Sequence, residues 1–71
     1  MKILVVYKSG RFDEFDNVKS VAVSLGPSKQ VLSPQQIKEL EMLNFQRDIY
    51  VFNDQSHLIA GGSIERITVS D

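Results

Sequence analysis

His57 is the side chain in this sequence best suited to proton transfer, because an unperturbed imidazole changes charge near neutral pH. It is the only histidine, and the sequence has no cysteine, so a His–His metal pair and thiolate chemistry are both excluded. A general base needs an orienting carboxylate, but Asp54 lies across an expected tight turn, where the geometry of a dyad is poor. We therefore predict no catalytic residue, no cofactor and no enzymatic activity. An enzyme subunit would require a concave pocket that holds His57 and a carboxylate.

Three carboxylates, those of Asp13, Glu14 and Asp16, lie close enough in the sequence to raise the question of a divalent cation site. The segment lacks the alternate ligand positions and the later bidentate Glu of a calcium loop. We therefore predict no metal site. A charged strand edge that discourages aggregation accounts for these residues.

Aromatic residues in and near this acidic segment suggest a protein contact. Phe12 and Phe15 flank the carboxylates, and exposed aromatic rings surrounded by charge are common anchors of protein–protein interfaces. The alternative is that these rings close the open ends of a small core. The predicted partner-binding residues are Phe12, Asp13, Glu14, Phe15, Tyr50, Asn53 and Asp54.

Binding of nucleic acid or a nucleotide is the second hypothesis. The net charge is −1 and the eight Lys and Arg residues are scattered, whereas nucleic-acid binders usually have a basic cluster. A small β-domain could still bind if Lys8, Arg11 and Arg47 converged beside Tyr50 or Phe12 as stacking partners. Separation of these residues would weaken the hypothesis. The sequence also lacks the acidic excess that a DNA mimic needs.

Short apolar segments separated by turn residues predict the elements that position these side chains, as an antiparallel meander. The predicted strands are residues 2–8, 12–15, 48–52, 57–60 and 64–69. Residues 18–25 fit both helical and strand spacing; their three valines favour a strand, and a second short helix is the alternative. Gly61-Gly62 predicts a turn with positive φ.

Ser33-Pro34-Gln35-Gln36 is the clearest local signal, because it has the form of a capping box with proline at the first helical position. It predicts a helix from Pro34 to Leu43 that turns Ile37, Leu40 and Leu43 toward the core. Residues 27–33 are expected to be a connector.

The first strand and the loop at residues 7–10 also resemble the opening of a flavodoxin-type nucleotide domain, in which such a loop cradles phosphate. That fold needs alternating strand and helix units of about 30 residues each, and this short chain has one clear helix signal. The carboxylates that follow the loop would also repel a phosphate. A β-hairpin is therefore predicted instead.

Together these patterns predict a single small domain over residues 1–71, of the α+β class. It has an antiparallel sheet of five to six short strands, with one helix at about 34–43 packed on one face. The absence of cysteine and of an apolar run near about 20 residues predicts a cytoplasmic protein without a membrane span. We expect a small non-enzymatic protein-binding module, able to form a homodimer through a sheet edge or an aromatic patch. Its size class fits a phage or mobile-element accessory protein that inhibits a host protein, such as a defence nuclease.

Overall fold

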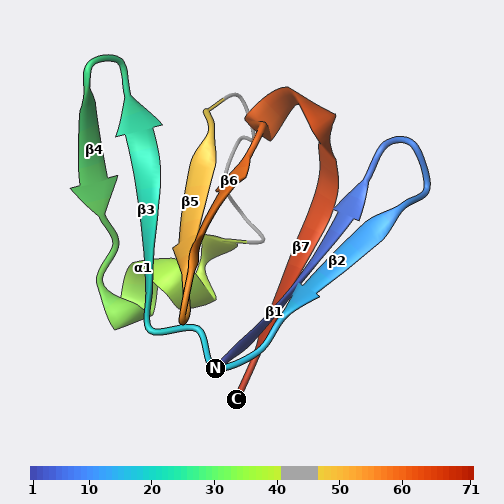
Figure 1. Ribbon diagram of the computed structural model, residues 1–71, viewed down its shortest axis with the longest axis horizontal. Coiled ribbons are helices and arrows are strands. Elements are labelled where there is room, and N and C mark those ends of the chain that lie inside the picture. The colour runs from blue at the N-terminus through green and yellow to red at the C-terminus, as the bar shows by residue number, and fades with distance from the viewer. Residues whose placement is uncertain (41–46) are drawn as a thin grey trace.

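The computed structural model describes residues 1–40 and 47–71, and these residues form seven strands in two antiparallel sheets (Figure 1). One short helix and one 3-10 turn are the other elements in the described residues. The predicted α+β class is therefore wrong. The described chain is mostly β, and its helix is too short to be a substantial packing layer.

The first sheet has the strand order β2–β1–β7. Its strands are β1 (Lys2–Tyr7), β2 (Phe12–Phe15) and β7 (Ile64–Ser70). The predicted β1–β2 hairpin is confirmed, and Gly10 adopts a left-handed φ of 90° in its turn. Both edges of β1 are paired, so β1 is the central strand of this sheet.

The second sheet has the strand order β4–β3–β5–β6. Its strands are β3 (Ser20–Leu25), β4 (Ser28–Val31), β5 (Ile49–Phe52) and β6 (Ser56–Ile59). The preference for strand within residues 18–25 is confirmed over β3. Strand β4 lies in the segment 27–33, which was expected to be a connector. The sequence did not predict this strand because its side chains are exposed and mostly polar and show no apolar alternation. Gly26, with a φ of 74°, allows the tight β3–β4 turn.

The chain passes from the first sheet to the second at residues 16–19. Asn17 adopts a left-handed φ of 55°, a conformation that Asn tolerates better than most residues. The N–H of Val18 then donates to the Met1 carbonyl at 2.9 Å, and the N–H of Lys19 donates to the Phe52 carbonyl at 2.8 Å. These two bonds attach residues 16–19 to the start of the first sheet and to β5 of the second. The strands therefore lie in two sheets, and the single meander predicted from the sequence is wrong.

Helix α1 (Pro34–Lys38) begins as predicted but is only five residues long. Both bonds of the capping box are present: Ser33 Oγ accepts from Gln36 N at 3.2 Å, and Gln36 Oε1 accepts from Ser33 N at 2.8 Å. Glu39 leaves the helical conformation, with φ −91° and ψ 5°, which ends the helix before the predicted boundary. Of the predicted helix, residues 41–43 lie outside the described residues.

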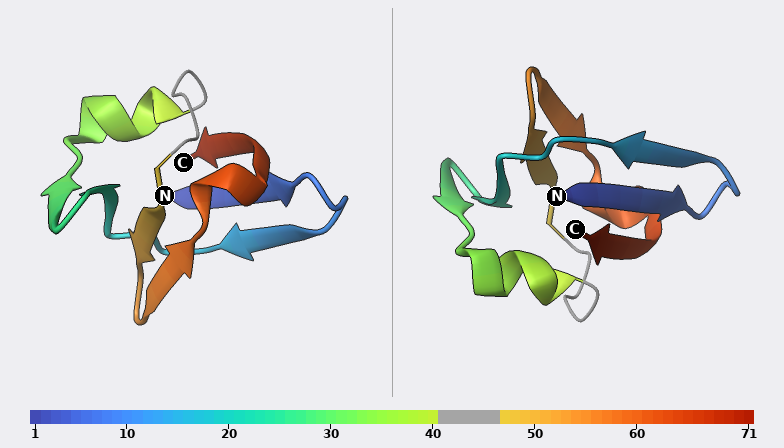
Figure 2. Two further views of the ribbon diagram at one scale, coloured as in Figure 1. Left: turned by 90° about the horizontal axis from the view of Figure 1, so that it is seen from above. Right: turned by 90° about the horizontal axis from the view of Figure 1, so that it is seen from below.

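The core lies between the inner faces of the two sheets, and α1 contributes to it (Figure 2). The buried members of this cluster are Ile3, Val5, Val18, Val21, Leu32, Ile37, Leu40, Ile49, Val51, Ile59, Ile64 and Ile67. Figure 2 shows α1 on the same side of the second sheet as β7, so the other side of that sheet is left uncovered by any described helix or strand. Each sheet therefore has an inner face in the core and an outer face toward solvent.

Gly61 allows a close approach between two segments that are distant in the sequence. It opens the 3-10 turn η2 (Gly61–Ser63), and its N–H donates to Asp48 Oδ1 at 3.2 Å. A Cβ at Gly61 would lie 2.9 Å from Arg47 N and closer still to the Arg47 carbonyl. The predicted positive φ at Gly61-Gly62 is wrong, because among the described glycines only Gly10 and Gly26 adopt it. Glycine is needed at position 61 because a side chain there would clash with the Arg47 backbone, and not because the position has a positive φ.

We expect Gly61→Ala to lower the free energy of unfolding by about 2 kcal/mol, because the new methyl group must push the Arg47 backbone away. Gly62→Ala is the matched control: its Cβ would meet no atom within 4 Å, so a change within about 0.5 kcal/mol is expected. Both variants lose a glycine from the unfolded chain. Urea unfolding of the two variants measures the difference, and equal stabilities would show that the close approach is unimportant.

Candidate functional site

The residues predicted to bind a partner do not form one surface. Phe12 lies on the first sheet and its side chain is 66% exposed. Phe15, three residues later, is partly buried against the core, and its ring centroid lies 4.9 Å from that of His57. Tyr50 lies on the second sheet, and Asn53 and Asp54 lie in the turn between β5 and β6.

Phe12 is the most exposed aromatic residue of this set, and it lies beside two half-buried aliphatic residues. Val6 is directly opposite Phe12 in the sheet, and Leu4 is directly opposite Glu14. Alternation along β1 places Leu4 and Val6 on the outer face, since Ile3 and Val5 are buried in the core. We call this area the Phe12 surface; it comprises Leu4, Val6, Phe12, Arg66 and Thr68.

Charged side chains border the Phe12 surface. Lys2 Nζ lies 3.4 Å from Glu14 Oε1 and 3.6 Å from Asp16 Oδ1, and all three side chains are exposed. The hydrogen bond to Glu14, followed by the charges of Glu14 and Asp16, raises the pKa of Lys2. Arg66 lies opposite Val6 on the other side of β1. The apolar centre is therefore bordered by both signs of charge.

Asp13 has a different role from the neighbouring carboxylates. Its Oδ2 accepts a hydrogen bond from the Tyr7 hydroxyl at 2.7 Å. Asp13 lies opposite Val5, whose side chain is buried in the core, so alternation places Asp13 on the inner side of the hairpin, away from Glu14. Partial burial, the hydrogen bond and the charge of Asp13 raise the pKa of Tyr7 to about 12. The phenol therefore stays protonated and positions Asp13.

A cleft of about 600 Å³ lies between the β1–β2 turn and η2. Its lining residues are Tyr7, Lys8, Ser9, Arg11, Phe12, Asp13, Gly62 and Ser63. Two of the three cations named for nucleotide binding, Lys8 and Arg11, are thus brought together with Phe12. The third cation, Arg47, lies elsewhere and donates to the Ser24 carbonyl at 3.3 Å.

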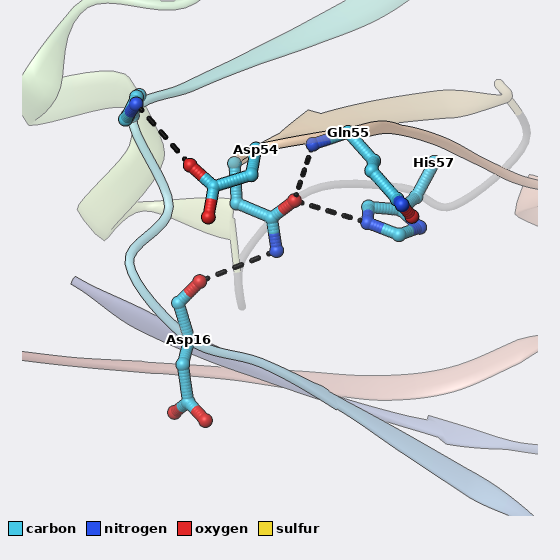
Figure 3. A network of polar contacts seen from close by, with 6 residues as sticks. Asp16, Asp54, Gln55 and His57 are labelled. Carbon is cyan, nitrogen blue, oxygen red and sulfur yellow. Dashed lines mark hydrogen bonds and ion pairs between the residues drawn. The ribbon is translucent and has the colours of Figure 1, made fainter.

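Asn53 links the turn between β5 and β6 to residues 16–19 through hydrogen bonds, and Figure 3 shows its labelled partners Asp16, Gln55 and His57. Its Nδ2 donates to the Asp16 carbonyl at 3.3 Å, while its Oδ1 accepts from Gln55 N at 2.9 Å. The same Oδ1 lies 3.1 Å from His57 Nε2, which must carry the proton because an amide oxygen only accepts. Asn53 and His57 therefore stabilise the turn by hydrogen bonds. The hydrogen-bond partner of the His57 ring is the amide of Asn53 and not a carboxylate.

Asp54, next to Asn53, forms an exposed ion pair with Lys19 at 3.5 Å (Figure 3).

Within residues 1–40 and 47–71, no group of three His, Cys, Asp or Glu residues could hold a metal ion. In the same part of the chain, every helix is too short to cross a lipid bilayer.

Two strongly exposed aliphatic residues were not among the predicted site residues. The side chains of Val31 and Leu58 are 67% and 62% exposed, and both lie on the second sheet. For Leu58 a signal is present in the sequence, because alternation with the buried Ile59 places Leu58 on the opposite face. Val31 could not be assigned in this way because β4 was not recognised as a strand.

No protein-family model, curated protein sequence or solved structure matches this chain. Its functional assignment therefore depends on the arrangement of its own residues.

We expect Tyr7 to ionise with a midpoint of about pH 12. In a Tyr50→Phe variant Tyr7 is the only tyrosine, so tyrosinate absorbance reports it alone. Asp13→Asn removes the neighbouring negative charge and should move the midpoint back toward the ordinary value of 10.0. Because folding raises this pKa, the stability that Tyr7 contributes is complete below about pH 10 and is lost as the pH rises through about 12. A midpoint near 10 that Asp13→Asn does not change would contradict the contact.

Asn53→Ala should lower the free energy of unfolding by about 1 to 3 kcal/mol, because it removes three hydrogen bonds: one joins the turn to Asp16, and two lie within the turn and β6. Asp54→Ala, at the neighbouring position, removes an exposed ion pair and should cost less than about 1 kcal/mol. Urea unfolding at neutral pH compares the two. If Asp54→Ala costs as much as Asn53→Ala, Asn53 is not the link between the sheets.

Proposed function

We propose that this chain is a small non-enzymatic protein-binding module, and that the Phe12 surface is its contact site. The observation that carries the proposal is the 66% exposure of the Phe12 ring on the outer face of a sheet. Burying a phenylalanine side chain in a partner's pocket is favourable by about 1.5 to 3 kcal/mol. A solvent-facing ring of this size is therefore a candidate hot spot.

The surroundings of Phe12 match the usual composition of an interface. Val6 and Leu4 extend the apolar centre along β1, and Lys2, Glu14 and Arg66 supply a charged border. An apolar centre excludes water at the contact, while the mixed charges at the border select the partner and its orientation. A partner with a pocket for Phe12 and complementary charges around it fits this surface.

Such a module acts by covering or locking a surface of its partner, since the proposal requires no chemistry. Inhibition of a host protein, for example a defence nuclease, is one role of this kind. The net charge of −1 gives no support to an inhibitor that imitates DNA.

Nucleotide binding is a second candidate because Lys8 and Arg11 line the same cleft. Asp13 also lines it, so the local positive charge is partly offset. Tyr50, one of the two proposed stacking residues, lies on the other sheet. The convergence that this hypothesis needs is therefore incomplete.

Capture from a lysate of the source cells tests the leading proposal, with the tagged chain as bait and with nuclease added to half of each sample. The wild type should retain a protein partner that survives nuclease. Phe12→Ala should weaken this binding by about 2 kcal/mol or more, close to thirtyfold, because truncating an interface anchor leaves its pocket empty. Quantitative mass spectrometry of the retained proteins gives the ratio.

Leu25→Ala is the matched control, because Leu25 is also an exposed apolar residue but lies on the second sheet. It should retain the partner as the wild type does. Loss of all retained proteins on nuclease treatment would favour the nucleotide candidate. Equal retention by Phe12→Ala and the wild type would remove Phe12 from the interface.

A further inference from the structure

The cleft beside η2 lies where the β1–β2 hairpin extends past the start of β7. The first residue of β7, Ile64, lies opposite Tyr7, so residues 8–11 continue beyond that strand (Figure 2). The pairing of β1 with β7 also shifts register just before Tyr7, and a bulge of this kind bends the strand and re-aims its side chains. The N–H of Lys8 donates to the Ser63 carbonyl at 2.9 Å, which attaches the base of the hairpin turn to η2. The cleft of about 600 Å³ lies between these two segments.

The charged residues that line the cleft leave it with an excess of positive charge. Lys8 and Arg11 supply two positive charges, and Asp13 supplies one negative charge. The ion pairs in the described part of the chain involve Lys2 and Lys19, so neither cation of the cleft is paired with a described carboxylate. A ligand with a single negative charge matches this lining. A phosphate monoester carries nearly two negative charges at neutral pH and would be repelled by Asp13.

Asp13 also offers the cleft a hydrogen-bond acceptor in a fixed position. The Tyr7 hydroxyl donates to its Oδ2 at 2.7 Å. An ionised carboxylate has about four lone-pair sites, so the other oxygen, Oδ1, can accept from a ligand. A hydroxyl or amino group on the ligand would supply that donor.

Phe12 gives the cleft an apolar wall, because its exposed ring is part of the lining. Sites for small molecules have volumes of about 300 to 1,000 Å³ and combine apolar surface with a few polar groups that fix the orientation of the ligand. This cleft has a volume within that range and both kinds of group.

We propose that the cleft binds a small carboxylic acid that has an apolar body and a hydroxyl or amino group. Lys8 and Arg11 bind the carboxylate of this acid. Asp13 accepts a hydrogen bond from its hydroxyl or amino group, and the apolar body lies against Phe12. The ligand differs in charge from a nucleotide, and the site does not use Arg47. The proposal does not depend on the proposed docking of a protein partner.

The exposure of the cleft sets the strength of binding. Lys8, Arg11 and Asp13 are all exposed, and ion pairs in contact with water contribute little free energy. We therefore expect a dissociation constant of about 1 mM.

Amide NMR titrations of the whole chain with phenyllactate, up to about 20 mM, test the proposal in this range. Phenyllactate has a carboxylate, a hydroxyl and a phenyl ring. The signals of residues 7–13 and 62–63 should shift and approach saturation. The same acid without the hydroxyl, 3-phenylpropionate, should bind about three- to tenfold more weakly, because Asp13 then receives no hydrogen bond.

Phenyl phosphate separates this ligand class from a nucleotide. It should bind more weakly than phenyllactate, since its second negative charge lies near Asp13. Tighter binding of phenyl phosphate than of phenyllactate would overturn the proposal and favour the nucleotide candidate.

Variants that remove one positive charge locate the site. Lys8→Gln and Arg11→Gln should each weaken phenyllactate binding by about threefold or more. Lys38→Gln is the matched control, because it removes the same charge from α1, outside the cleft, and should leave binding unchanged. All three positions are exposed, so folding should be preserved, and circular dichroism verifies this. Equal weakening by the three variants would show that net charge alone attracts the acid, which would overturn the assigned site.

Asp13→Ala tests the hydrogen-bond acceptor. It should remove the preference for phenyllactate, so that phenyllactate and 3-phenylpropionate bind with equal affinity. A preference that survives in this variant would overturn the role of Asp13. A wild-type chain whose signals do not shift with phenyllactate at about 20 mM would overturn the whole proposal.

Discussion

One set of aliphatic side chains, shared by the inner faces of both sheets, holds this small structure together. Ile3 and Val5 of the first sheet and Val21 and Val51 of the second belong to the same buried cluster. A chain of 71 residues can bury only about 60% of the surface that it exposes when unfolded. This single core therefore uses one face of each sheet and leaves the opposite face of each in contact with water.

The two outer faces differ in their exposed side chains. The Phe12 surface has one prominent ring and a border of both charge signs, so it can select a partner by charge and by a fitting pocket. The outer face of the second sheet carries the exposed Val31 and Leu58 at its two edges, and Ala22 between them is only 1% exposed. Hydrogen bonds of Asn53 and of residues 18 and 19 connect the two sheets between these faces.

The local signals in the sequence predicted part of the fold well. The capping box at Ser33 and the hairpin at Gly10 depend on neighbouring residues, and both were confirmed. Strand β4 could not be predicted because its pairing with β3 depends on backbone bonds and not on apolar side chains. The passage from one sheet to the other is accompanied by bonds from Val18 and Lys19 to carbonyls that are distant in the sequence, which no local pattern predicts.

The candidate site was also only partly predictable. The sequence placed Phe12 among the predicted partner-binding residues, and in the structure Phe12 is exposed to solvent. The same reasoning failed to separate Phe12 from Phe15, because the partial burial of Phe15 depends on its packing against the core and on His57 of the other sheet. Asn53 was predicted to bind a partner, yet its side chain donates a hydrogen bond to the Asp16 carbonyl of the same chain.

We propose above that a protein partner docks on the Phe12 surface. The methyl NMR spectrum of the chain, recorded with and without the captured partner, tests this docking most directly. Leucine and valine methyl groups lie on both outer faces, so one sample reports both. We expect the signals of Leu4 and Val6 to shift or broaden on binding, while those of Val31 and Leu58 stay unchanged. Changes confined to Val31 and Leu58, with Leu4 and Val6 unaffected, would contradict it.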